Sequence, residues 1–327
     1  MKAVIYTAYG TPNVLQVTEI EKPTPKDDEV LIKIQATAVN FADWALLTGS
    51  PFLIRLTEGF PKPKHPILGS DVAGQVAAVG KDVTQFQVGD RVFGDLSGQG
   101  RGGLAEYVCA QESAVARIPE NVSYVHAAAV PMAAVTALQG IRDAGQIQAG
   151  QKVLINGASG GVGSFAVQIA KAYDTEVTAV CSTGKMEMVR SIGADHAIDY
   201  TKENFTENGK RYDLIVGVNG YHPLGHYKRV LAPNGTYVCA GGTMPQIFQA
   251  ILLGPLLSMG GNKKLKSMGV AHPSQDDLQF MADLVATGKV TPVIDTYYLL
   301  DEAVKAFEHL GKKSAKGKII ITMEDEA

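Results

Sequence analysis

The spacing of apolar and polar residues divides the chain near residue 125 into two parts of different character. Before that point, short runs with partial alternation are separated by glycine-rich turns, as at 30–39 and 72–79. Closely spaced short strands of this kind are typical of a mostly antiparallel, barrel-like domain. Further strands are predicted at 1–6, 88–94 and 103–108, and a helix at 41–47. The proline-rich segment 50–66 is predicted to be a loop that carries substrate contacts.

From about residue 126, after an alanine-rich helical segment at 126–144, predicted strands alternate with predicted helices. The strands are apolar throughout, which indicates a parallel sheet covered on both faces. They are expected at 153–156, 177–181, 196–199, 214–218 and 236–240, with helices at 165–172, 185–192 and 224–230. Right-handed crossovers make such a sheet doubly wound, and dinucleotides bind at its carboxyl edge.

The tail after residue 270 has helical patterns at 276–286 and 301–310 and strand patterns at 290–299 and 318–322. We expect it to return to the first domain and complete it. The predicted α/β architecture is therefore a substrate domain formed by 1–125 plus 270–327, with a Rossmann domain at 126–269 inserted into it. The catalytic cleft is expected between the two domains.

The most apolar stretch, 247–261, contains proline and glycine and is too short to span a membrane. Lys263, Lys264 and Lys266 follow it. A buried helix, an interface segment, a wall of the substrate pocket and a lipid-contacting surface are all compatible with this pattern.

Composition narrows the class of protein. Hydrophobic residues make up 46% and charged residues 19%, which is typical of a globular protein with a sizeable core. The net charge of −3, without a block of like charges, argues against nucleic acid as a main partner. The three cysteines are far apart, so no disulfide framework is predicted and a reducing compartment fits. The first residues predict a strand and not a signal peptide, so we expect a cytoplasmic location without a stable membrane span.

The strongest motif is a strand, a glycine loop and a helix at 152–172. Ala158-x-Gly160-x-x-Gly163 is the dinucleotide fingerprint with alanine in the first glycine position. Such a loop lets backbone N–H groups approach a pyrophosphate at the positive end of the helix dipole. The predicted contacts are Ser159, Gly160, Gly161 and Val162.

The turn after the second strand indicates which dinucleotide binds. NAD-selective folds place a carboxylate there, but residues 182–185 contain none. Hydroxyls of Ser182 and Thr183 and the ammonium of Lys185 would attract a 2′-phosphate, and the phenol of Tyr200 could donate to it. This pattern favours NADPH over NADH. The alternative is that Ser182 and Lys185 only cap and solvate the next helix.

Two other patterns in the sequence are compatible with a different kind of site. His222 and His226 have helical spacing, but no third ligand is near in sequence, so no metal site is predicted. Residues 157–161 match the Gly-x-Ser-x-Gly frame of a hydrolase around Ser159. The continuation to Gly163 and the phosphate-friendly second turn favour a cofactor loop over a nucleophile.

Taken together, these motifs resemble the medium-chain dehydrogenase/reductase superfamily, in its zinc-free, quinone oxidoreductase-like branch. The resemblance covers nearly the whole chain and includes the segments 38–43, 66–74, 88–92, 103–107 and 315–318. Zinc alcohol dehydrogenases of this superfamily have cysteine in place of Asn40 and Gly-His-Glu in place of residues 69–71. The cysteine lobe for structural zinc is also missing, so the resemblance implies a zinc-free protein.

The resemblance implies a groES-like substrate domain, a Rossmann domain and hydride transfer from NADPH to a quinone or an α,β-unsaturated carbonyl. It places Asn40 and Thr136 beside the nicotinamide as catalytic candidates. It also implies a homodimer, for which 236–240 is expected to be the edge strand that pairs across a two-fold axis. Besides the glycine loop, Ser182, Lys185 and Tyr200, it implies cofactor contacts from Val218, Ala240, Gly241 and Lys316.

The substrate site departs from the family pattern. Some members have a tyrosine shortly after the residue that matches Asp43, whereas this chain has Trp44. Trp44 is either an aromatic wall of the pocket or a packing residue of its helix, and Phe52 is a second substrate candidate. A zinc-independent alcohol dehydrogenase and a non-catalytic NADPH-binding module remain as alternative functions.

Overall fold

The computed structural model describes residues 1–324 of the chain. The chain forms two compact units. Unit 1 comprises Met1–Met132, Pro273–Ala286 and the chain from Ile294 onward, and unit 2 comprises Ala133–His272 and Thr287–Val293. These limits differ from the predicted ones at 125 and 270. One reason is that Thr291 exchanges backbone hydrogen bonds with the side chain of Gln168, a residue of unit 2.

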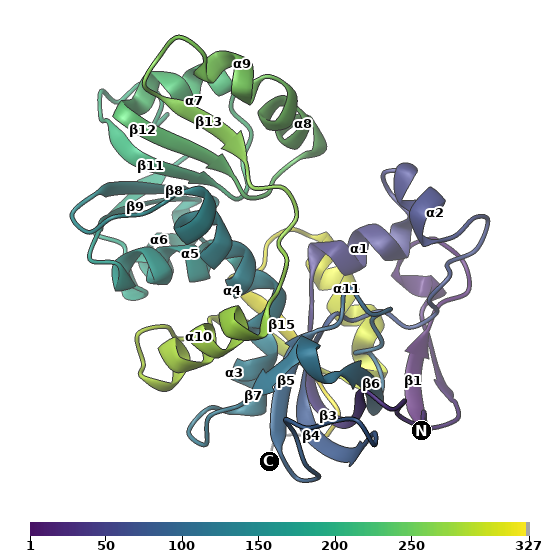
Figure 1. The fold of residues 1–327 in the computed structure, drawn as a ribbon. Coiled ribbons are helices and arrows are strands. Elements are labelled where there is room, and N and C mark those ends of the chain that lie inside the picture. The colour runs from purple at the N-terminus through teal and green to yellow at the C-terminus, as the bar shows by residue number, and fades with distance from the viewer. Residues whose placement is uncertain (325–327) are drawn as a thin grey trace. The chain divides into compact units, whose positions relative to one another are not determined.

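Unit 1 is built on a seven-stranded sheet in the order β14-β15-β3-β4-β5-β7, with β6 also pairing with β3 (Figure 1). Its strands are β3 (Glu29–Val39), β4 (Asp71–Val79), β5 (Arg91–Asp95), β6 (Tyr107–Gln111), β7 (Val115–Arg117), β14 (Ile294–Leu299) and β15 (Lys318–Thr322). β1 (Lys2–Ile5) and β2 (Gln16–Glu19) form a separate antiparallel pair. Because β15 pairs antiparallel with β3, the tail returns to the first part of the chain, as its pattern predicts.

The helices of unit 1 are α1 (Phe41–Thr48), α2 (Leu53–Glu58), α3 (Tyr124–Ala129), α10 (Gln275–Ala286) and α11 (Ala303–Gly311). α3 packs against β3 and β4, which carries unit 1 past residue 125. The prediction of a loop over 50–66 was wrong in part, because α2 lies inside it. The strands predicted to begin at 88 and 103 begin at Arg91 and Tyr107. Leu104, which contributed to the predicted strand, lies in an irregular segment instead. It is buried there, and its N–H donates to the carbonyl of Leu68.

Unit 2 is a six-stranded parallel sheet in the order β10-β9-β8-β11-β12-β13. Its strands are β8 (Lys152–Asn156), β9 (Glu176–Cys181), β10 (His196–Asp199), β11 (Tyr212–Gly217), β12 (Leu231–Cys239) and β13 (Lys264–Ser267). The chain moves outward from β8 to β10 and then returns to β11 on the other side of β8. This reversal is the switch point at which open α/β sheets bind ligands.

The helices of unit 2 are α4 (Pro131–Leu138, which begins in unit 1), α5 (Gly161–Ala172), α6 (Met186–Ser191), α7 (Leu224–Val230), α8 (Met244–Leu252) and α9 (Gly254–Ser258). A π-helical turn at Gln139–Ala144 continues α4. The prediction that 236–240 forms the sheet edge was wrong, because β13 pairs with the outer side of β12. β13 is short and alternates lysine with apolar or small residues, so the apolar pattern did not reveal it.

Candidate functional site

The glycine loop of unit 2 joins β8 to α5 at the centre of the parallel sheet (Figure 1). Gly157 has φ +87°, a left-handed conformation that favours glycine. A Cβ on Gly163 would lie 2.1 Å from the carbonyl oxygen of Gly157, so the first turn of α5 closes tightly on the loop. Gly160 is the N-cap of α5 and provides no side-chain cap. The loop therefore leaves the positive end of this helix available to an anionic group.

The ends of β11 and β12 lie next to this loop. The N–H of Val218 donates to the carbonyl of Asn156 at 2.9 Å, and the N–H of Ala240 donates to that of Gly217 at 2.9 Å. A Cβ on Gly241 would lie 2.7 Å from the carbonyl oxygen of Val218. The structure thus brings the predicted contacts Val218, Ala240 and Gly241 to the edge of the sheet that carries the glycine loop.

Two buried residues that the sequence did not single out hold this edge together. The Asn156 amide donates to the Gly220 carbonyl at 3.2 Å and to the Tyr227 hydroxyl at 2.9 Å. Tyr227 is fully buried and stacks on Tyr237, with ring centroids 4.1 Å apart. Burial raises the pKa of Tyr227, so its phenol stays neutral and can accept this bond. Asn156 could have been noticed in the sequence, because it is a polar residue at the end of an otherwise apolar strand.

The turn after β9 holds the residues predicted to select the dinucleotide. Ser182 is half-buried, while Thr183 and Tyr200 are exposed. The Thr183 hydroxyl donates to Asp199 Oδ2 at 2.5 Å, and Thr201 donates to Oδ1 through its hydroxyl at 2.7 Å and its N–H at 3.0 Å. The bonds from Thr183 and Thr201 lower the pKa of Asp199 to about 2. The hydroxyl hydrogen of Thr183 is therefore already engaged.

This arrangement corrects the sequence analysis on one point. Residues 182–185 contain no carboxylate, but the parallel pairing of β10 with β9 places Asp199 beside Cys181. A buried, ionised carboxylate thus lies behind the turn, with 6% of Asp199 exposed. It was missed because Asp199 follows the turn by more than a dozen residues in sequence, and only strand pairing brings it there.

Unit 1 contains a buried polar network at the end of β3 and the start of β4. Lys318 Nζ donates to Asn40 Oδ1 at 2.5 Å and to Asp71 Oδ2 at 3.0 Å. Asn40 Nδ2 donates to Asp71 Oδ2 at 3.0 Å and to the Ala38 carbonyl at 3.4 Å. Asp71 Oδ1 accepts from the N–H of Met132 at 2.8 Å. The amide of Asn40 is thus fully bonded within the protein, which fixes its orientation.

Asp43 and Asp95 add two more buried carboxyl groups to this region. Asp43 Oδ2 accepts from the N–H of Asn40 at 2.8 Å, and its Oδ1 accepts from the N–H of Gly69 at 3.2 Å. Burial raises the pKa of Asp43 to about 6. Burial and the nearby Asp71 raise the pKa of Asp95 to about 6. Lys318 is the cation that bonds directly to this cluster, and its charge offsets that of Asp71.

The remaining predicted residues fall in different places. Thr136 is half-buried on α4. Trp44 packs against α11, since a Cβ on Gly311 would lie 2.4 Å from its ring, and it borders the core of unit 1. Phe52 is 57% exposed and meets Phe60 edge-on at 6.0 Å. Lys316 is exposed in unit 1.

The histidine pair of unit 2 is the alternative metal site. His222 lies before α7 and His226 within it, with ring centroids 6.5 Å apart. Among residues 1–324, no group of three or more histidine, cysteine, aspartate or glutamate side chains is arranged to hold a metal ion.

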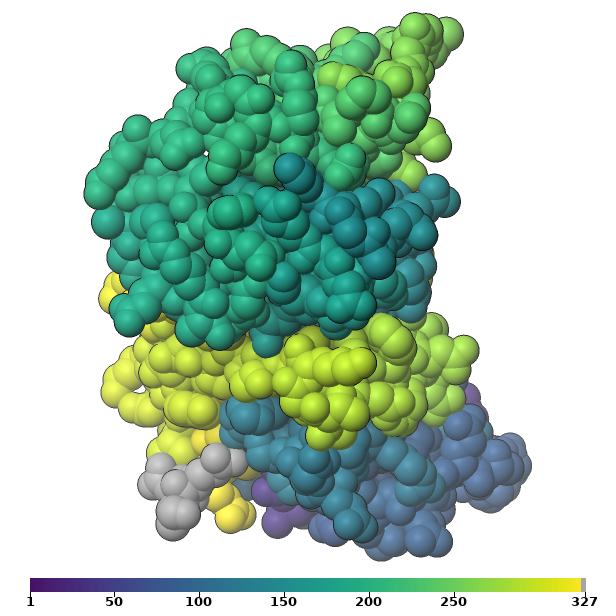
Figure 2. All heavy atoms as spheres, turned by 90° about the vertical axis from the view of Figure 1, so that its left-hand side faces the viewer, coloured from purple at the N-terminus to yellow at the C-terminus, as the bar shows by residue number. Residues whose placement is uncertain are grey.

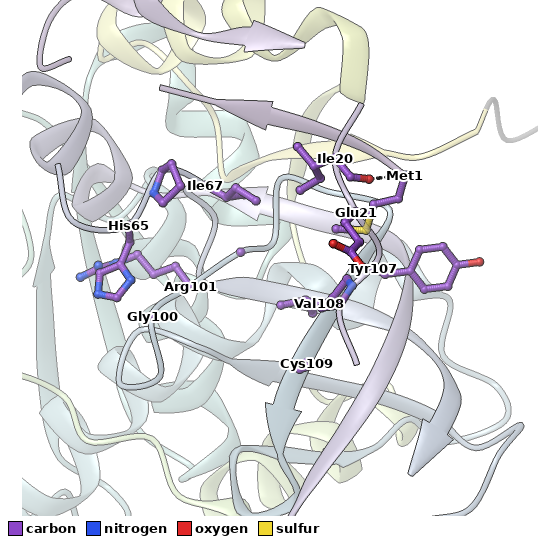
Figure 3. Close-up of a pocket in the computed structure, with 13 residues that line it drawn as sticks. Met1, Ile20, Glu21, His65, Ile67, Gly100, Arg101, Tyr107, Val108 and Cys109 are labelled. Carbon is purple, nitrogen blue, oxygen red and sulfur yellow. Dashed lines mark hydrogen bonds between the residues drawn. The ribbon is translucent and has the colours of Figure 1, made fainter. Parts of the chain in front are cut away.

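A surface groove of about 250 Å³ lies elsewhere in unit 1. Figure 3 shows Ile20, Ile67 and Val108 on its walls, with His65 and Arg101 at one end. His65 and Pro66, at the end of the segment 50–66 that was predicted to carry substrate contacts, line this groove, but none of the individually predicted site residues does. It is therefore separate from the buried network around Asn40.

Comparison with known proteins decides the family. The family model described as alcohol dehydrogenase GroES-like domain matches residues 26–120, and that described as zinc-binding dehydrogenase matches 192–321. The chain is 35% identical over 334 residues to the "Chloroplast envelope quinone oxidoreductase homolog" of Arabidopsis thaliana, covering 98% of each. The chain belongs to the medium-chain dehydrogenase/reductase superfamily. It is an oxidoreductase of the quinone oxidoreductase-like branch, as the sequence motifs predicted.

Two further members of the superfamily support this placement. The "NADPH-dependent alkenal/one oxidoreductase, chloroplastic" of Arabidopsis thaliana is 33% identical over 333 residues, covering 98% of this chain and 79% of that protein. The solved quinone oxidoreductase from Coxiella burnetii has a TM-score of 0.88 at 27% identity and covers 99% of both chains. A GroES-like domain with an inserted Rossmann domain is thus the architecture of this superfamily member.

Proposed function

We propose that this protein reduces quinones or α,β-unsaturated carbonyl compounds by hydride transfer from NADPH, without zinc. The observation that carries the proposal is the tight glycine loop at the switch point of the parallel sheet, with an uncapped helix end behind it. The names of the relatives, a quinone oxidoreductase homolog and an NADPH-dependent alkenal/one oxidoreductase, support the same reaction.

The residues present fit a dinucleotide. A Cβ on Gly163 would meet the Gly157 carbonyl, so this position has the close helix–strand packing that the third glycine of the dinucleotide fingerprint provides. Ser159, Gly160, Gly161 and Val162 would hold the pyrophosphate. Val218, Ala240 and Gly241, at the ends of the neighbouring strands, would line the path of the nicotinamide half, and we retain Lys316 as a further proposed contact.

Selection of NADPH over NADH is proposed to depend on Ser182, Lys185 and Tyr200. A 2′-phosphate there would accept charge-assisted hydrogen bonds from the lysine and neutral ones from the two hydroxyls. Asp199 works against a direct role for the Thr183 hydroxyl, because it accepts that hydrogen. We therefore assign Thr183 to shaping the turn through Asp199.

When bound, NADPH supplies the hydride, and the chain supplies position and polarity. We propose that Asn40 and Thr136 lie beside the reacting groups, and that Trp44 and Phe52 border the substrate. Because the amide of Asn40 is held by Lys318 and Asp71, it would act as a fixed dipole that needs no reorganisation during the reaction. Water would supply the proton to the reduced product.

The test is a screen of NADPH oxidation against a panel of quinones, enones, enals and saturated ketones. We expect turnover with quinones or conjugated carbonyls and little with saturated ketones, because no Lewis acid polarises a simple carbonyl in this proposal. Equal rates on a saturated alcohol or ketone would indicate an alcohol dehydrogenase. Tight NADPH binding without turnover of any acceptor would indicate a non-catalytic module.

A homodimer in the cytoplasm is also proposed. β13 is the outer strand of the parallel sheet, and an edge strand can pair with its copy across a two-fold axis. Cys109, Cys181 and Cys239 are free thiols, which fits a reducing compartment. Light scattering that shows a monomer at assay concentration would overturn the dimer.

A further inference from the structure

One carboxylate, that of Asp199, links the carboxyl ends of β9 and β10. Its Oδ2 accepts a hydrogen bond from the Thr183 hydroxyl, and its Oδ1 accepts from the hydroxyl and the N–H of Thr201. Thr183 begins the 3₁₀ turn Thr183–Lys185 that follows β9, and Asp199 is the last residue of β10. The turn proposed to select the cofactor is thus tied by a side chain to the end of the neighbouring strand.

The proposed ligands of the 2′-phosphate lie on both sides of this link. Ser182 and Lys185 belong to the turn after β9, while Tyr200 follows Asp199, is 61% exposed and donates its N–H to the Cys181 carbonyl at 3.1 Å. Figure 2 shows the teal atoms of this part of the chain on the surface of unit 2. Ser182 is the N-cap of the 3₁₀ turn, but within residues 1–324 its side chain makes no capping bond. This argues against a role for Ser182 as a helix cap alone.

The direction of the Thr183 hydroxyl decides what the turn offers to an anion. A hydroxyl has one hydrogen to donate. Asp199 Oδ2 takes it at 2.5 Å, whereas the other neighbour, Thr201 Oγ1, lies 3.3 Å away. Thr183 is exposed, so its oxygen presents only lone pairs to an approaching group. A 2′-phosphate has only acceptor oxygens, and it therefore gains no hydrogen bond from Thr183 while Asp199 holds this hydrogen.

The charge of Asp199 acts less strongly on the cofactor than this lost donor does. Three hydrogen bonds from Thr183 and Thr201 end on the ionised carboxylate, and Lys202 Nζ lies 3.7 Å from Oδ2. The negative charge is thus largely compensated before a cofactor arrives, and salt screens the remainder.

We propose that Asp199 is a specificity-determining residue that limits the preference for NADPH, because its carboxylate holds the Thr183 hydrogen away from the 2′-phosphate. NADH lacks this phosphate, so the engaged hydroxyl costs it nothing. The inference rests on the proposed function in one respect, which is the position of the 2′-phosphate at this turn.

Asp199→Asn changes the hydrogen bond while it nearly preserves the shape of the side chain. The amide oxygen can accept both bonds from Thr201, and the amide nitrogen then donates to Thr183 Oγ1. The Thr183 hydrogen becomes free to bond the 2′-phosphate, and the link between the two strand ends is kept.

The experiment is calorimetric titration of the full chain with NADPH and with NADH, read as the ratio of the NADH to the NADPH dissociation constant. Asp199→Asn should raise this ratio about tenfold through tighter NADPH binding, because a hydrogen bond to a charged group is gained. Thr183→Val alone should change the ratio by less than about twofold, since its hydroxyl gives the cofactor no hydrogen. Combined with Asp199→Asn, it should remove the gain. Asp199→Ala removes the same acceptor and should shift the ratio in the same direction, so the test does not depend on one variant.

Asp213→Asn is the matched control. Asp213 Oδ2 accepts from the N–H of Lys152 at 2.8 Å, near the amino ends of β11 and β8 and away from the glycine loop. The substitution removes one negative charge from unit 2 and should leave the ratio unchanged, and circular dichroism checks that every variant is folded.

An unchanged or smaller ratio in Asp199→Asn would overturn the proposal, as would a double variant that keeps the whole gain or a control that shows the same gain. An unaltered chain that binds NADH as tightly as NADPH would refute the proposed selectivity. A tenfold rise of its ratio in Asp199→Asn, lost again with Thr183→Val, would still support the role of Asp199. The two failures are therefore distinguishable.

Discussion

Lys318 and Asp71 form an ion pair in unit 1 with 3.0 Å between Nζ and Oδ2, and the two side chains are 3% and 0% exposed. Lys318 is the first residue of β15, and Asp71 is the first residue of β4. In the sheet, β3 lies between these two strands. Asn40 bridges the two by accepting from Lys318 and donating to Asp71. The C-terminal strand is thus linked to the first half of the chain by a buried charge as well as by strand pairing.

Lys318→Met should lower the free energy of unfolding by about 3–5 kcal/mol, because it leaves Asp71 as a buried charge without its cation. Urea denaturation followed by circular dichroism measures the change. Lys81→Met is the control, since Lys81 and Asp27 form an ion pair with 70% and 63% of their side chains exposed. The control should lose less than about 1 kcal/mol. Equal losses in the two variants would contradict a special contribution of the buried pair.

Asp95 should make the protein less stable as the pH rises from about 4 to about 6. Its pKa in the folded protein is raised from 3.8 to about 6, so the folded state holds a proton that the unfolded state has already released in this range. Asp95→Asn removes this effect. The free energy of unfolding of this variant, minus that of the unaltered chain, should therefore rise by about 3 kcal/mol between pH 4 and pH 7.

Asp195→Asn is the control for this pH experiment. Burial alone would raise the pKa of Asp195, but Lys171 and the N–H of Val177 lower it below 3.8. The ionised Asp195 therefore contributes fully to the free energy of unfolding above about pH 4, and this contribution is lost only in stronger acid. The stability difference between this variant and the unaltered chain should stay constant between pH 5 and pH 7. A flat difference for Asp95→Asn as well would show that its carboxyl group is not protonated in the folded protein.

Asn40→Ala should lower kcat for the preferred acceptor by about tenfold or more, because it removes an oriented dipole and releases Lys318 and Asp71. The KM for NADPH should change little, which steady-state kinetics can separate from kcat. Thr37→Val is the comparison, since the buried Thr37 hydroxyl donates to the Asp71 carbonyl at 2.5 Å but belongs to no predicted site. It should lose stability and keep its kcat. Full turnover by Asn40→Ala would remove the catalytic role of Asn40.

The dissociation constant for NADPH should be smaller than that for NADH, and Ser182→Ala and Lys185→Ala should each weaken NADPH binding about tenfold. Binding of NADH should be almost unaffected, because it has no 2′-phosphate. Lys210→Ala, at an exposed lysine elsewhere in unit 2, should leave both constants unchanged. Calorimetric titration gives all of these values, and NADH binding as tight as NADPH would refute the proposed selectivity.

Gly163→Ala should abolish binding of either dinucleotide and lower the melting temperature. The added Cβ would lie 2.1 Å from the Gly157 carbonyl oxygen, so the loop or the helix must move. Gly225→Ala is the matched control, because no atom lies within 4 Å of a Cβ there and Gly225 is inside α7. It should be neutral or stabilise by about 1 kcal/mol. A folded Gly163→Ala variant with unchanged NADPH affinity would place the pyrophosphate elsewhere.

The elements with a strong apolar period could be predicted closely. α7 occupies 224–230 as predicted, and both ends of β8, β9 and β10 lie within one residue of their predicted limits. α2 was missed because prolines flank it on both sides, and β13 was missed because lysines stand on both sides of its one apolar residue, Leu265. The apolar residues of 247–261 gave no indication of which way they face, since periodicity describes one helix and not what covers it.

The sequence by itself determined the strand–glycine loop–helix unit and the alternation of strands and helices along the second half of the chain. Both features depend on residues that are close together in the chain. Only the tertiary structure placed Asp199 behind the turn at 182–185 and held the amide of Asn40 between Lys318 and Asp71. The physical reason is that a hydrogen bond or an ion pair depends on distance in space. Strand pairing brings together residues as far apart as 40 and 318, and no local pattern of apolar and polar positions records it.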